Sequence, residues 1–291
     1  MGILRSQLVN MNQHYRRFSL DYFLDCQQRL GIRQIELWCG ASHFWLDHEG
    51  TGDVPALKQK LLDHDVRVVS VTAPSIAYQY QYASQEPELL EYSFRYFSNA
   101  IRLAAQLGAD RVVVHSGSCS KISREEALAL AGDTLQRALA AMDEEGLGHV
   151  HLCPETMGKI NQLGTLDEVL SLCCLDERLI PCIDFGHLNA RTLGGIAQKS
   201  DYEAILLAVG ERLGEGRMKG FHAHFSKIQY TEKGGEKAHL TFADTVYGPA
   251  YEPLMELICQ YGCSPTFICE SAGTQAEDAR TMKDYYHSLQ K

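Results

Sequence analysis

The sequence has no run of apolar residues long enough to span a membrane. A membrane-spanning helix needs about 18–20 consecutive apolar residues, and no stretch of the 291 residues approaches that length. The opening segment, MGILRSQLVNMNQHYRRF, also lacks the apolar centre and cleavage site of a signal peptide. We therefore expect a soluble, cytoplasmic protein with no membrane partner.

The sequence also has fewer basic than acidic residues and no cysteines at CxxC spacing. The chain carries 27 Lys and Arg against 37 Asp and Glu, a net charge of −10. This balance argues against a broadly basic surface for nucleic acid, although a local basic groove remains compatible with it. None of the ten cysteines forms a CxxC pair, and Cys153, Cys182 and Cys269 lie in apolar runs. Such cysteines are typical of buried thiols in a reducing compartment.

What the sequence does contain is an alternation of short β-branched runs with longer amphipathic segments. The strand-like runs lie at 2–9, 32–38, 66–73, 110–116, 149–155, 180–185, 220–226 and 265–271. The helical patterns lie at 87–108, 123–146, 164–175, 201–213, 249–262 and 274–289. Within the second of these, Ser123 precedes Glu126 by three residues, which is the spacing of a helix-capping box.

Eight strands, each followed by a helix, are the number that closes a parallel barrel. A doubly wound open sheet is the alternative architecture. It usually has fewer strands, and no Gly-rich dinucleotide loop follows the first strand here. Since no linker or internal repeat stands out, we predict one α/β domain, a TIM (β/α)8 barrel over residues 1–291, and leave open whether it forms a homo-oligomer.

Ligand-type side chains mark the carboxyl ends of five consecutive predicted strands, which is where the chemistry of such barrels gathers. They are His115, Glu155, Asp184 with His187 just beyond, His222 and His224, and Glu270, and His239 follows in a long loop. One such residue is more often simply solvated or hydrogen-bonded, but five strands in succession indicate convergence. Three carboxylates and one imidazole suit Mn²⁺, Mg²⁺, Co²⁺ or Zn²⁺. The predicted metal ligands are Glu155, Asp184, His224 and Glu270.

Five segments resemble, in order and spacing, parts of endonuclease IV, the apurinic-site endonuclease. They are VVVHSG, CPETMGKINQLGTLDEVL, CIDFGHLNAR, FHAHFSKIQYTEKGGEKAHL and FICES. The chain therefore resembles the xylose isomerase-like TIM-barrel superfamily, which also includes many sugar isomerases and epimerases. The likeness covers most of the chain and is strongest from 110 to 285. In the N-terminal half, IELWCGASHFW and TAPSIAYQYQYASQEPELL are similar to segments of sugar-amine epimerases.

The resemblance implies as many as three metal positions. His115 would bind the first ion, and Glu155 would bridge the first and second. Asp184, His224 and Glu270 would complete the second, while His187 and His239 would belong to the third. Two departures stand out: Thr72 occupies the place of a first-ion histidine, and Lys237 replaces an aspartate of the third site, with Glu236 as the nearest substitute. Only the second position is complete, and it is the one that the sugar isomerases and epimerases keep.

These residues support three hypotheses about function. The first is a metal-dependent isomerase or epimerase of a small carbohydrate, in which Glu155 and Glu270 transfer a proton at carbon. In that reading His187 and Lys227 hold substrate oxygens, and the loop aromatics Trp45 and Tyr78 stack on the sugar. The second is an endonuclease IV-like phosphodiesterase that acts on abasic DNA with a zinc cluster. The third is a metal-binding accessory subunit without turnover of its own.

Overall fold

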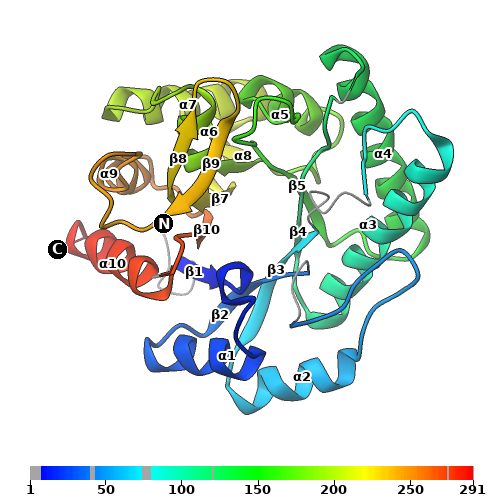
Figure 1. The fold of residues 1–291 in the computed structure, drawn as a ribbon, viewed down its shortest axis with the longest axis horizontal. Helices are drawn as coiled ribbons and strands as arrows, with labels where there is room; N and C mark the ends of the chain where they lie inside the picture. Colours follow the sequence, from blue (N-terminus) through cyan, green and yellow to red (C-terminus); the bar gives the residue numbers. More distant parts are fainter. Residues whose placement is uncertain (1–7, 40–42, 74–79, 120, 274, 291) are drawn as a thin grey trace.

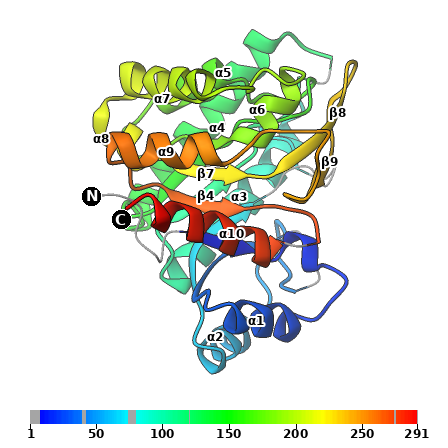
Figure 2. The same ribbon diagram turned by 90° about the vertical axis from the view of Figure 1, so that its left-hand side faces the viewer.

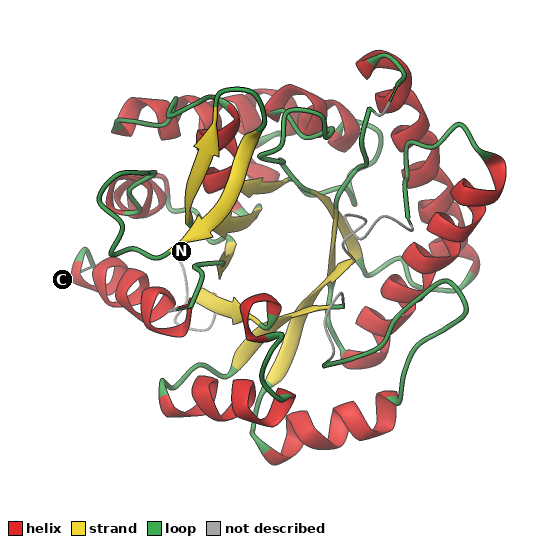
Figure 3. Ribbon diagram, in the orientation of Figure 1, coloured by secondary structure: helices red, strands yellow, loops and turns green. Residues whose placement is uncertain are grey.

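Eight parallel strands form a ring at the centre of the computed structural model, which describes residues 8–39, 43–73, 80–119, 121–273 and 275–290 (Figures 1 and 3). Their order is β5-β4-β3-β2-β1-β10-β7-β6. Their bounds are β1 Leu8–Met11, β2 Gln34–Trp38, β3 Arg67–Ala73, β4 Arg111–Val114, β5 His151–Pro154, β6 Cys182–Asp184, β7 His222–Phe225 and β10 Thr266–Cys269.

The ring is nearly closed by contacts between its two end strands. The backbone N–H of Ile180 donates to the carbonyl of Leu152 at 3.0 Å, and that of Thr156 donates to Cys182 at 3.0 Å. Parallel bridges also join Leu152 to Leu179 and Glu155 to Cys182. The TIM-barrel prediction is therefore confirmed.

The strands are apolar on both faces, as expected of parallel strands covered on each side. One set of side chains packs outward beneath the helices and includes Val112 and Leu152. The alternate set fills the barrel and includes Val113, Cys153 and Cys182. A barrel filled in this way is a packed core and not a pore, so chemistry is confined to its ends.

Helices surround the ring on the outside (Figure 3). They are α1 Leu20–Arg29, α2 Val54–Asp63, α3 Pro87–Leu107, α4 Arg124–Glu144, α5 Leu166–Cys173, α6 Phe185–Arg191, α7 Lys199–Leu213, α8 Glu215–Lys219, α9 Glu252–Tyr261 and α10 Gln275–Ser288, with a short 3₁₀ helix, η2, at Gln13–Tyr15. The Ser123 hydroxyl accepts from the backbone N–H of Glu126 at 3.1 Å, so the predicted start of α4 is confirmed. No helix in the described part of the chain is both long and apolar enough to cross a membrane.

Two sequence-based predictions, one of a strand and one of a loop, differ from the structure in ways that affect the site. The first strand lies at Leu8–Met11 and so runs two residues beyond the predicted range, whose residues 2–7 are outside the described chain. The predicted long loop after β7 is wrong, because an antiparallel hairpin of β8 Lys227–Thr231 and β9 Gly235–Leu240 occupies it. The paired glycines in EKGGE allow the tight reversal, and Gly235 has φ of +70°. The hairpin projects from one end of the barrel, at the right edge of Figure 2.

A buried carboxylate fastens α5 to the start of α4. Glu168 accepts from the backbone N–H groups of Gly164 and Thr165 at 2.8 and 2.9 Å. It also accepts from the Arg124 guanidinium at 2.7 and 2.9 Å. Burial alone would raise the pKa of Glu168, but these hydrogen bonds outweigh burial and lower it to about 2.

We expect Glu168→Gln to lower the free energy of unfolding at pH 7 by about 1–3 kcal/mol, because charge-assisted bonds to a buried carboxylate are lost. The pKa of Glu168 is depressed in the folded state. Its contribution is therefore complete above the unfolded pKa of about 4.3 and is lost as the pH falls toward about 2. Denaturant unfolding at several pH values should show the difference from wild type shrinking over that window. The exposed Glu177→Gln is the control, with a change within about 0.5 kcal/mol. A constant difference between pH 7 and pH 2.5 would contradict this account.

Candidate metal centre

The carboxyl ends of β5, β6 and β10 bring three acidic side chains together. Glu155 directly follows β5, Asp184 ends β6, and Glu270 directly follows β10. All three are buried, with at most 3% of the surface of any residue exposed. The Asp184 carboxylate also accepts from the backbone N–H of His187 at 2.8 Å and so caps α6. This cap explains why a strand passes directly into a helix at DFGH, with an acid and an imidazole one turn apart.

His224 of β7 faces the two glutamates. Its Nδ1 is 3.1 Å from Glu155 Oε1 and 3.2 Å from Glu270 Oε1. Nδ1 of His187 lies on the other side, 3.1 Å from Asp184 Oδ2 and 3.4 Å from Glu155 Oε1. Ligand atoms of Glu155, Asp184, His187 and Glu270 all lie within 4.8 Å of one another. This group contains three of the four predicted ligands together with His187, whereas His224 meets it through Nδ1 and is itself grouped with Cys182 and His222.

The donor set fits a divalent cation. Within the described chain, no Lys or Arg side chain forms a salt bridge to any of the three acids. Glu155 Oε2 and Asp184 Oδ2 are buried without an aligned hydrogen bond, although His115 Nε2 and His187 Nδ1 lie 2.9 and 3.1 Å from them. Burial raises the pKa of Asp184 to about 6; nearby His187 opposes this shift, while Glu270 and Glu155 add to it. For Glu270, burial acts upward but His224 outweighs it and lowers the pKa to about 2. A bound cation would compensate this crowding of buried carboxylates.

A second group of ligand-type residues adjoins the first and depends on a β-bulge in β9. Tyr230 pairs with Glu236 and Gln229 with Ala238, so Lys237 is the extra residue. In a regular strand Glu236 and His239 would face opposite sides. The bulge returns both to one side, while Lys237 is exposed.

The two imidazoles beside Glu236 are each held through Nδ1. His187 Nδ1 is 2.9 Å from the carbonyl of Thr156, and His239 Nδ1 is 2.8 Å from the Ser226 hydroxyl. Their Nε2 atoms lie 3.5 and 3.9 Å from the Glu236 carboxylate. With Nδ1 of each ring so engaged, Nε2 would be the ligand atom, and the two imidazoles and one carboxylate lie close enough together to hold a second ion.

The remaining predicted ligand, His115, approaches Glu155 from β4. Its Nε2 is 2.9 Å from Glu155 Oε2, so Glu155 lies between His115 and His224. Thr72 is not turned to this pair: its hydroxyl donates to Glu36 inside the barrel. Among the described residues, the first metal position of the resemblance therefore keeps only His115 and the shared Glu155.

Two residues of the site were missed by sequence reasoning. Glu36 of β2 is fully buried beneath His224, and the only signal was an acid within the apolar run QIELW. The ring of His14, in η2, lies near that of His239, with centroids 5.4 Å apart and the planes tilted by 57°. Burial and the charge of His239 lower the pKa of His14 to about 4. No sequence pattern distinguishes His14 from an exposed loop histidine.

The structure gives no evidence that the other predicted substrate-binding residues, Lys227, Trp45 and Tyr78, contact a substrate. Lys227 Nζ donates to the carbonyl oxygens of Phe242 and Asp244, which fastens the segment that follows the hairpin. Trp45 is 70% exposed, and its indole N–H donates to Asp47 at 2.9 Å. Tyr78 lies outside the described residues. Their roles toward a substrate stay predictions.

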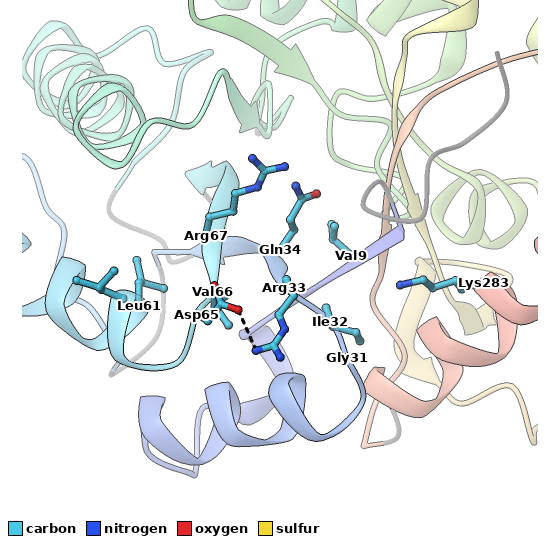
Figure 4. Close-up of a pocket in the computed structure, with 11 residues that line it drawn as sticks. Val9, Gly31, Ile32, Arg33, Gln34, Leu61, Asp65, Val66, Arg67 and Lys283 are labelled. Carbon is cyan, nitrogen blue, oxygen red and sulfur yellow. Dashed lines mark ion pairs between the residues drawn. The ribbon is translucent and has the colours of Figure 1, made fainter.

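A pocket of about 570 Å³ lies elsewhere (Figure 4). It is lined at the amino ends of the strands by Val9, Gln34 and Arg67, beside the ion pair of Arg33 with Asp65 at 3.4 Å. None of its eleven lining residues belongs to the candidate metal centre. Since conserved chemistry in TIM barrels resides at the carboxyl ends, the size of this pocket does not make it the active site.

A nearly closed parallel barrel whose carboxyl ends converge on buried acids and imidazoles defines a TIM-barrel protein with a metal-type site. The chain belongs to the family described as xylose isomerase-like TIM barrel, which matches residues 25–287. The resemblance noted from the sequence is therefore confirmed.

The proteins similar to this chain include an uncharacterized protein, a probable endonuclease and an epimerase-like protein. An uncharacterized protein of Methanocaldococcus jannaschii is 33% identical over 202 residues, covering 69% of this chain and 72% of the relative. A probable endonuclease 4 of Persephonella marina is 22% identical over 229 residues, covering 76% and 77%. Among solved structures, a D-tagatose 3-epimerase-like protein has a TM-score of 0.72 at 18% identity, covering 99% of this chain and 98% of its own. The IolI protein with a bound zinc atom has a TM-score of 0.69 at 13% identity, covering 99% and 97%. These structural likenesses establish the shared fold.

Proposed function

We propose that the protein is a divalent-metal-dependent isomerase or epimerase of a small carbohydrate. The observation that carries the proposal is the pair Glu155 and Glu270, each within 3.2 Å of His224 Nδ1 at the carboxyl end of the barrel. Asp184 completes a set of three carboxylates and one imidazole, which suits Mn²⁺, Zn²⁺, Co²⁺ or Mg²⁺. The IolI protein, which shares this fold, has a bound zinc atom in its solved structure, and this supports the choice of a divalent ion.

The bound ion would supply Lewis-acid stabilisation of negative charge on substrate oxygens. Everything else in the proposed reaction falls to the chain. One Oε of Glu155 removes the proton from the carbon beside a carbonyl, and one Oε of Glu270 returns a proton to it. His187 positions a substrate oxygen from the edge of the site. The packed barrel beneath the site excludes water from below.

The test is a screen of small sugars, their phosphates and inositols for deuterium uptake at carbon in D₂O. We expect at least one substrate to exchange in the presence of added Mn²⁺, Zn²⁺ or Co²⁺ and to stop exchanging after chelation. Metal analysis of protein purified without chelators accompanies it, with about one tightly bound ion per chain expected. Turnover of a sugar with no solvent-derived hydrogen at carbon would refute the proton-transfer scheme.

A second candidate is an endonuclease IV-like phosphodiesterase that acts at abasic sites in DNA. The His187, Glu236 and His239 group favours it, because a second ion beside the first suits in-line displacement at a phosphodiester. The likeness to the probable endonuclease 4 of Persephonella marina points the same way. Against it, Thr72 stands where the resemblance expects a ligand of another ion, and its hydroxyl is engaged with Glu36.

We expect no efficient nicking of an abasic duplex by this protein. The assay uses added Zn²⁺ or Mn²⁺ and an undamaged duplex as the control substrate. Metal-dependent cleavage at roughly 1 per second or faster, an ordinary enzymatic rate, would reverse the order of the two candidates. Two or three bound ions per chain, in place of about one, would favour the same reversal.

A further inference from the structure

A carboxylate buried within the barrel lies directly behind the candidate metal centre. Glu36 has no exposed surface, and its two oxygens face four groups from two other strands. Oε1 accepts from the Thr72 hydroxyl at 2.5 Å and lies 3.0 Å from His224 Nε2. Oε2 accepts from the Ser70 hydroxyl at 2.5 Å and lies 3.0 Å from His222 Nε2. Each oxygen therefore has one hydroxyl of β3 and one imidazole of β7.

The contact between Glu36 and His224 spans the barrel interior. β2 and β7 are not neighbours in the sheet, because β1 and β10 lie between them in the strand order. Removing a carboxylate from water costs several kcal/mol unless its partners compensate. Glu36 faces two imidazoles at the same distance, those of His222 and His224, and of these His224 also contacts the acids of the candidate metal centre.

His224 must present one particular nitrogen to an ion. Its Nδ1 faces Glu155 and Glu270, and its Nε2 faces Glu36. A ligating imidazole nitrogen is unprotonated, so the ring proton must be on Nε2. The Glu36 contact has ion-pair distance without hydrogen-bond alignment, so its effect on that proton is electrostatic.

We propose that Glu36 is a positioning residue that holds His224 as a metal ligand, with the proton on Nε2 and Nδ1 turned to the ion. At many metal sites a carboxylate behind a ligating histidine accepts its second ring N–H and fixes the ring; here the negative charge 3.0 Å from Nε2 would favour the proton on that nitrogen. The inference rests on the proposed metal centre and names the residue that organises it. It also gives Thr72 a function: its hydroxyl holds the Glu36 oxygen that faces His224, where the resemblance expects an ion ligand.

The test compares metal binding by wild type and Glu36→Gln, which keeps the side-chain shape and removes the charge. We expect affinity for Zn²⁺ or Co²⁺, measured by competition with a chromophoric chelator, to fall about 10–100-fold. The visible absorption of the Co²⁺-loaded protein should also change in position or intensity. A purely structural role would leave that spectrum unaltered. Thermal unfolding of both metal-free proteins shows whether the variant is folded.

A matched pair of milder variants keeps the inference testable if Glu36→Gln does not fold. Thr72→Val removes the hydroxyl on the oxygen that faces His224, whereas Ser70→Ala removes the one on the oxygen that faces His222. We expect Thr72→Val to weaken metal binding several-fold more than Ser70→Ala. Equal affinities in both variants, or an unchanged affinity and spectrum in folded Glu36→Gln, would overturn the role of Glu36 while leaving the metal centre intact. Failure of the wild type to bind any divalent ion would instead remove the proposed metal centre and this inference together.

Discussion

Replacing Glu155 with Gln is expected to slow proton exchange at the substrate carbon by about 10²–10⁴-fold, the usual contribution of a general base. Glutamine has the shape of glutamate but cannot accept a proton. Glu155 is 1% exposed and lies between His115 Nε2 at 2.9 Å and His224 Nδ1 at 3.1 Å. These contacts leave little room for a water molecule to replace its carboxylate as the base.

The measurement is solvent deuterium uptake into whichever sugar the wild type turns over. Part of the loss could come from weaker metal binding, so the ion content is determined in the same sample and exchange is measured at saturating metal. The control is Glu144→Gln, at an exposed position near the end of α4, which should exchange at the wild-type rate. Undiminished exchange in metal-loaded Glu155→Gln and Glu270→Gln alike would show that neither carboxylate is the base.

Removal of the Asp184 carboxylate is expected to empty the metal centre. Asp184→Ala and Glu270→Ala each delete one of three buried acids, and we expect at least about a 100-fold loss of affinity, the upper end of what outer-shell changes alone produce. Metal analysis after gel filtration should find little ion in either variant. Both proteins should retain the far-UV circular dichroism of a folded barrel.

Asp184 has a second role that the choice of variant must separate. Its side chain caps α6 by accepting from the His187 N–H, and loss of a cap costs about 1 kcal/mol. Asp184→Asn keeps an oxygen for the cap but removes the charge. We therefore expect Asp184→Asn to lose the ion as Asp184→Ala does, yet to unfold closer to wild type. A full complement of metal in Asp184→Asn and Glu270→Ala would contradict the assignment of the site.

Strand-level features of this protein could be predicted from the sequence because they arise from local patterns. A parallel strand buried on both faces must be apolar, so runs such as RVVV in β4 are conspicuous. The polar residue that ends each run then lies at the barrel rim by topology alone. Glu155, Asp184 and Glu270 are therefore expected at one end of the barrel from the strand order along the chain alone.

Features that depend on two distant segments could not be predicted in this way. The role of Glu36 depends on Ser70 of β3 and His222 of β7, which are 34 or more residues away along the chain. The role of Lys227 likewise depends on carbonyl groups that its side chain reaches only once the hairpin has formed. His14 lies beside His239 because β1 and β7 are brought close by pairing with β10, which lies between them in the sheet. Sequence periodicity carries no information about any of these contacts.

Because of the bulge at Lys237, the spacing of residues in the sequence does not show which side chains share a face of the hairpin. The residue two positions before His239 is a lysine, so a motif search at that spacing misses Glu236, which the fold brings beside His239. The looped-out Lys237 shortens the effective spacing, and glutamate's extra methylene lengthens the reach of the acid at position 236. Deleting Lys237 would remove the bulge and leave Glu236 two residues before His239 in a regular strand, so the two side chains would still face the same side. Relatives that differ by one residue in this hairpin are better compared by which face each side chain occupies than by aligned letters.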